Sequence, residues 1–105
     1  MCGTTQPVDT NLLVQVCAVR SKNLENVESA VIVRNNRSGM YGTEVAAALY
    51  EEYSGYVLAR STCPNSGVAP NSWSVCFGTV REDGYPVYVG SSGVNGKNTY
   101  GSPDV

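Results

Sequence analysis

The sequence predicts an α+β domain in which a small antiparallel sheet of about five strands carries one helix on one face. Three observations lead to this expectation: a chain of only 105 residues, one segment with helical signals between β-rich runs, and four cysteines able to form stabilising disulfides. At this length folding buries roughly two-thirds of the surface that the unfolded chain exposes, so the chain can build one modest core.

The strands are predicted by runs rich in β-branched and aromatic residues that end at turn-forming residues. The expected strands cover residues 11–19, 29–34, 56–62, 73–80 and 85–89. The first of these runs reads NLLVQVCAV and alternates between two faces, as a strand does. Asp83 and Gly84 are typical of a tight hairpin turn, which is expected to join the last two strands.

The helix is predicted over residues 43–54. Thr43 is a good N-cap, and Glu44 lies where the helix dipole favours a negative charge. Three consecutive alanines follow, and Gly55 stands where a C-terminal cap is expected. We therefore expect a helix of about three turns that packs its apolar side on the sheet.

The single domain is expected to span residues 1–89 and to be followed by a mobile tail at residues 90–105. Glycine, serine and asparagine dominate this last segment, and its large apolar residues are Val94, Tyr100 and Val105. A segment of this composition has little apolar surface to bury, which favours mobility.

The charges argue against a nucleic-acid partner, and the short apolar runs argue against a transmembrane segment. The chain has seven Lys and Arg residues and nine Asp and Glu residues, which give a net charge of -2, and no two basic residues are adjacent. Binding to a nucleic-acid backbone needs clustered cations, so no nucleic-acid partner is expected. The longest apolar runs are only a few residues, far short of the roughly 20 that span a bilayer, so no transmembrane segment is expected.

Four cysteines in a short chain indicate a disulfide framework and an oxidising compartment. Metal binding is not expected, because the cysteines are widely spaced and the chain has no histidine. Four cysteines allow three pairings. If the strands at 56–62 and 73–80 are antiparallel neighbours, Cys63 and Cys76 lie close enough to bridge, and Cys2 then pairs with Cys17.

The start of the chain has neither a charged segment nor an apolar one, so either the protein is cytosolic or its targeting segment has been removed. The abrupt start favours removal, and the chain is therefore expected to be secreted or periplasmic. Cys2 could instead be the lipid-bearing first residue of a bacterial lipoprotein. The even cysteine count favours the disulfide over lipidation. Asn36, Arg37 and Ser38 match the N-glycosylation sequence, which matters only in a eukaryotic source.

The segment from Pro64 to Val75 is the candidate binding site, as a proline-bearing loop between Cys63 and Cys76. A loop anchored by a disulfide has little conformational entropy left to lose when it binds. The residues expected to contact a partner are Pro64, Asn65, Val68, Pro70, Asn71 and Trp73. The alternative is that the bridge ties down a long loop for stability alone.

The residue types predict a binding protein rather than an enzyme. Without histidine the chain cannot form a catalytic Ser-His or Cys-His pair, and we interpret its carboxylates as surface charges. No phosphate-binding motif is present, so no cofactor is expected. We therefore expect a secreted interaction protein of effector, immunity or ligand type that binds a protein partner. A role in virulence would fit such a protein. A protease inhibitor presenting residues 64–75 and a small histidine-independent toxin or enzyme are the alternatives, and the oligomeric state stays open.

Overall fold

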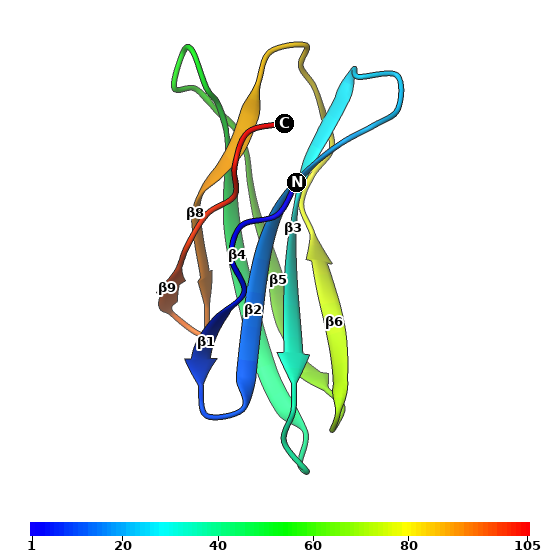
Figure 1. Ribbon diagram of the computed structural model, residues 1–105, viewed down its shortest axis with the longest axis vertical. Coiled ribbons are helices and arrows are strands. Elements are labelled where there is room, and N and C mark those ends of the chain that lie inside the picture. Colours follow the sequence, from blue (N-terminus) through cyan, green and yellow to red (C-terminus); the bar gives the residue numbers. More distant parts are fainter.

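The chain folds into two antiparallel sheets that pack face to face as a β-sandwich (Figure 1). The computed structural model describes all 105 residues. Sheet A contains β1 (Gln6–Asp9), β2 (Leu12–Arg20), β3 (Asn26–Asn35), β6 (Ser72–Phe77) and β7 (Arg81–Glu82). Sheet B contains β4 (Tyr41–Glu51), β5 (Val57–Val68), β8 (Val87–Val94) and β9 (Lys97–Thr99).

Each sheet has a simple strand order. Sheet A runs β1-β2-β3-β6, with β7 also paired to β3, and sheet B runs β5-β4-β8-β9. The chain therefore crosses between the sheets three times, after β3, after β5 and after β7. Within the sheets, β4 lies in the interior of sheet B, hydrogen-bonded on both sides, and β3 lies in the interior of sheet A.

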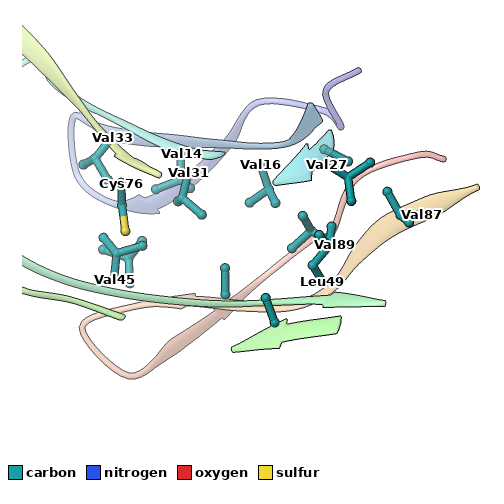
Figure 2. Packing of buried hydrophobic residues seen from close by; sticks show 14 of the residues in the cluster. Val14, Val16, Val27, Val31, Val33, Val45, Leu49, Cys76, Val87 and Val89 are labelled. Atoms are coloured by element: carbon teal, nitrogen blue, oxygen red, sulfur yellow. The ribbon is translucent and has the colours of Figure 1, made fainter. Parts of the chain in front are cut away.

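The core is a layer of small branched side chains between the two sheets. Successive residues of a strand point to opposite faces, so alternate positions of each strand reach this layer. Figure 2 shows the side chains of the two sheets pointing toward one another. Its labelled members are Val14, Val16, Val27, Val31, Val33 and Cys76 from sheet A, and Val45, Leu49, Val87 and Val89 from sheet B.

The predicted α+β class is wrong, because the segment expected to be a helix forms β4. The inward side chains of this strand follow a period of two and are Thr43, Val45, Ala47 and Leu49. The helix propensity of the alanines is worth a few tenths of a kcal/mol per residue. Pairing β4 with both β5 and β8 supplies hydrogen bonds along its whole length, so tertiary pairing overrides local propensity.

The hairpin expected between residues 73–80 and 85–89 is also absent. β6 belongs to sheet A, whereas residues 87–89 begin β8 in sheet B. The Asp83-Gly84 turn is part of the segment that connects the two sheets. The expected domain boundary after residue 89 falls within β8. Residues 90–105 complete β8, form β9 and end beside β8, where Val105 exchanges two backbone hydrogen bonds with Val87 at 2.9 and 3.1 Å.

A disulfide closes one open side of the sandwich. Cys63 lies on β5, the edge strand of sheet B, and its bridge to Cys76 reaches β6, the edge strand of sheet A. The two strands are therefore neighbours across the layers and not partners within one sheet. The second bridge, between Cys2 and Cys17, attaches the N-terminal residues to β2 within sheet A.

Polar contacts close the opposite side, where β1 of sheet A meets the segment after β9. The backbone N–H of Tyr100 donates to Oε1 of Gln6 at 2.8 Å, and Nε2 of Gln6 donates to the Tyr100 carbonyl at 3.5 Å. Lys97 Nζ donates to the Val8 carbonyl at 3.0 Å. Both lateral openings of the sandwich are thus bridged by side chains.

Asn35 organises the end of the sandwich where the chain crosses between sheets. Its side chain is fully buried, and its Nδ2 donates to the carbonyls of Gly39 and Val68 at 2.8 and 2.9 Å and to Ala69 at 3.3 Å. Its Oδ1 accepts from the backbone N–H of Arg37 at 2.9 Å. One amide group therefore holds the β3–β4 turn against the end of β5.

Replacing Asn35 with alanine is expected to lower the free energy of unfolding by about 2–4 kcal/mol, because buried carbonyls lose their donor and a cavity is left. Asn98 is the matched control, since its side chain is exposed and its replacement with alanine should change stability by less than about 0.5 kcal/mol. Urea unfolding followed by circular dichroism measures both. Equal stabilities for the two variants would contradict the role given to Asn35.

Removing the bridge between the sheets with Cys63→Ala and Cys76→Ala is expected to cost about 3 kcal/mol, because the unfolded chain gains freedom across the loop. Hydrogen exchange should also speed up along β5, whose edge is no longer fastened to sheet A. The Cys2→Ala and Cys17→Ala variant removes a bridge of similar span but should leave β5 protected. Unchanged β5 protection after loss of Cys63–Cys76 would show that the bridge does not hold this edge.

Candidate functional site

The two outer faces of the sandwich differ in chemistry. The outer face of sheet A carries six large apolar side chains together with Gln15, Glu28 and Arg34, and we call it the apolar face. Its apolar members are Leu13, Val19, Ile32, Trp73, Val75 and Phe77. The outer face of sheet B carries a hollow lined by small and polar residues, which we call the polar groove. Each outer face consists of the strand residues that alternate with the core residues and therefore point away from the core.

The strand register assembles the apolar face in rows. Residues that are directly opposite in an antiparallel pair point to the same side of the sheet. The rows across β2, β3 and β6 are Leu13–Arg34–Trp73, Gln15–Ile32–Val75 and Cys17–Ala30–Phe77, and Val19–Glu28 follows on β2 and β3. The face therefore has an apolar middle with one charged residue toward each end of β3.

Two aromatic side chains stand out from this face into solvent. Trp73 and Phe77 are each 61% exposed, and both lie on the edge strand β6. Leu13, Ile32 and Val75 beside them are half-buried. A hollow of about 180 Å³ opens between Leu13, Ile32 and Arg34 and their neighbours. Larger exposed apolar patches on protein surfaces are typical of interaction sites.

The charged residues of the apolar face have no ionic partner in the chain. Both ion pairs of the molecule are made by Asp9, with Arg37 at 3.4 Å and with Lys97 at 3.8 Å. The guanidinium of Arg34 donates from Nε to Oδ1 of Asn36 at 2.7 Å, and Glu28 has no cation within reach. Glu28 and Arg34 thus flank the apolar centre as unpaired charges.

The polar groove lies over β4, β5, β8 and β9 and encloses about 410 Å³. It exists because its floor is built from small residues, among them Ala46, Ala48 and Gly93. Glu44 and Arg60 supply one charge of each sign at its walls, and serine, threonine and asparagine supply the remaining polar groups. This arrangement can hold a small polar group, but it contains no pair of a nucleophile and a neighbouring base.

Two carboxyl groups at one end of the sandwich, those of Glu51 and Glu52, each lie beside another carboxyl group. A hydrogen bond with Asp83 raises the pKa of Glu51, and a hydrogen bond with Asp104 raises the pKa of Glu52. At the other end, the hydrogen bond from the Thr10 backbone N–H and the charge of Lys97 lower the pKa of Asp9. These carboxyls lie outside the polar groove.

No group of three or more Cys, Asp or Glu side chains is arranged to hold a metal ion. The structure has no helix with the length and apolarity that crossing a membrane requires.

The segment predicted as a binding loop is mostly strand. Pro64 to Val68 belong to β5, Ser72 begins β6, and only residues 69–71 form the turn. Val68 is 1% exposed and belongs to the core, so it cannot contact a partner. The other five predicted residues are exposed: Pro64, Asn65, Pro70, Asn71 and Trp73.

Of the predicted contact residues, Trp73 alone reaches the apolar face. Pro64 and Asn65 lie on the edge of sheet B instead. Sequence reasoning missed Leu13, Ile32 and Phe77 as surface residues. A signal was available, because residues 11–19 and 29–34 are apolar on both alternating faces, whereas a strand with one solvated face usually alternates with polar residues.

Comparison with known proteins gives a likeness of fold. No protein-family model matches the chain, and no curated protein matches it. Among solved structures, the chain is similar to part of a β-glucuronidase from glycoside hydrolase family 2, with a TM-score of 0.52 and 17% sequence identity. The similarity covers 86% of this chain and 11% of the β-glucuronidase chain. The chain thus spans about a tenth of that enzyme, and what the two share is the arrangement of strands.

Proposed function

We propose that this chain is an exported interaction domain that binds a protein partner through the apolar face and does not catalyse a reaction. The observation that carries the proposal is the pair of exposed aromatics, Trp73 and Phe77, beside the half-buried Ile32 and Val75. Aromatic side chains are enriched at the centres of protein interfaces, and tryptophan is among the residues that contribute most to binding.

The rigidity of the face supports the same function. Trp73 and Phe77 lie on a strand that is hydrogen-bonded to β3 and covalently fastened to β5 through Cys76. A surface held in this way loses little conformational entropy on binding. The disulfide predicted to constrain a loop therefore supports a strand that presents Trp73, and this favours the apolar face over residues 64–71 as the contact surface.

The covalent framework supports export. Two disulfides in a domain of 105 residues are consistent with an extracellular or otherwise oxidising compartment. Within such a compartment, an effector, immunity or ligand role fits a small domain whose chemistry is concentrated in a contact surface. The absence of histidine from the sequence supports a role in binding over catalysis.

Trp73→Ala is expected to weaken partner binding by tenfold or more, because the exposed ring is the largest apolar group on the face. Its unfolding free energy should change by less than about 1 kcal/mol, since the ring is mostly in solvent. Tyr56→Ala is the matched control, an exposed aromatic between β4 and β5.

The measurement is quantitative mass spectrometry of proteins retained by each immobilised variant from the extracellular fraction of the native source. Proteins held by the wild type and by Tyr56→Ala but lost with Trp73→Ala are the expected result. Retention that does not depend on Trp73 would refute the apolar face as the binding surface.

A further inference from the structure

We propose that the protein seated on the apolar face is a second copy of this chain, giving a two-fold symmetric dimer in which two sheets A pack face to face. This inference rests on the proposed function, because it names the partner of the same surface. The argument comes from the distribution of charge on β3.

Glu28 and Arg34 point outward from the same strand at opposite ends of the apolar centre. They are six residues apart, which is about 20 Å along a strand. Both are half-buried and neither has an ionic partner within the chain. A surface with opposite charges at its two ends is complementary to a second copy that is turned end for end.

The symmetry that pairs these charges is specific. An isologous contact brings the same patch of two subunits together about a two-fold axis. An axis in the plane of the interface, perpendicular to the strands and midway between Ala30 and Ile32, places Glu28 of each copy opposite Arg34 of the other. Two salt bridges result, one at each end of the interface.

The apolar residues fit the same arrangement. The axis places the row of Ala30 opposite the row of Ile32. Ala30 itself is only 4% exposed, so its exposed neighbour Phe77 and the half-buried Ile32 make the contact in these rows. On β6 the rows place Phe77 beside Ala30 and Val75 beside Ile32, so Phe77 of each copy faces Val75 of the other. The exposed phenylalanine ring is then covered by an apolar side chain.

The other two-fold arrangement of these faces is disfavoured. An axis parallel to the strands would place Glu28 opposite Glu28 and Arg34 opposite Arg34. Like charges brought together at an interface oppose association. The charge pattern therefore favours the arrangement in which the strands of the two copies run antiparallel. In this arrangement the two sheets A stack with nearly aligned strands, which is a common packing of β-sheets.

The size of the face sets the expected affinity. Three strands and four rows span about 10 Å by 20 Å between their outermost backbone positions. This face is smaller than the roughly 800 Å² that each partner of a standard interface buries, so we expect a weak dimer with a dissociation constant of about 100 μM or more.

Sedimentation equilibrium of the full chain between about 1 μM and 1 mM tests the inference. The wild type is expected to dimerise. Glu28→Arg alone and Arg34→Glu alone should each weaken dimerisation tenfold or more, because both ends of the interface then carry like charges. An equimolar mixture of the two variants should associate about as tightly as the wild type, because every charge again meets its opposite.

Glu44→Arg and Arg60→Glu are matched controls that make the same charge changes on the polar groove of sheet B. They should leave dimerisation within about twofold of the wild type. Circular dichroism melting curves should show that all four variants remain folded.

Three results would overturn the inference: a monomeric wild type at about 1 mM, a dimer that the sheet A charge variants leave intact, or a mixture that associates more tightly than the wild type. The last would indicate the parallel arrangement. The capture assay with Trp73→Ala is independent of this outcome. If the chain is monomeric while Trp73 still governs capture of a different protein, the self-association fails and the proposed function stands.

Discussion

The face-to-face packing of two valine-rich inner layers is the interaction on which the rest of the molecule depends. Alternate residues of each strand point into this layer. Several of them are almost completely excluded from solvent, among them Val16, Val31, Val87 and Val89. Short branched side chains fill the space between the two sheets, as Figure 2 shows. Because the inner faces supply the stability, the outer positions of the same strands are free to carry the chemistry of recognition.

A two-layer fold of this size also has two open sides, and the chain closes each of them differently. The Cys63–Cys76 bridge and the buried Asn35 fasten the side and end where β5 turns into β6. Gln6 and Lys97 fasten the other side through hydrogen bonds to the backbone. The covalent closure lies next to the exposed aromatics of β6, so the same bond that secures the sandwich also makes the proposed contact surface rigid.

The sequence allowed part of this structure to be predicted. Alternation within residues 11–19 and 29–34 located β2 and β3, and the even number of cysteines indicated the disulfide framework. The helix prediction at 43–54 failed because alanine and a good N-cap are local signals, whereas β4 is fixed by partners on both sides that lie far along the chain. Trp73 was predicted to begin a strand at residues 73–80, and it does lie on β6, but residues 64–68 before it form part of β5 and not the predicted loop. The role of Trp73 as a contact residue stays a prediction. The full face could not be predicted, because it exists only when the register of β2, β3 and β6 brings distant residues into rows.

We propose that recognition belongs to the outer face of sheet A and not to the polar groove of sheet B. Two-dimensional ¹H–¹⁵N NMR spectra of the full chain over a dilution series test this residue by residue. We expect concentration-dependent shifts for the amides of β3 and β6 and no shifts for those of β4 and β5. Shifts centred on the polar groove, around Ala46 and Arg60, would contradict it.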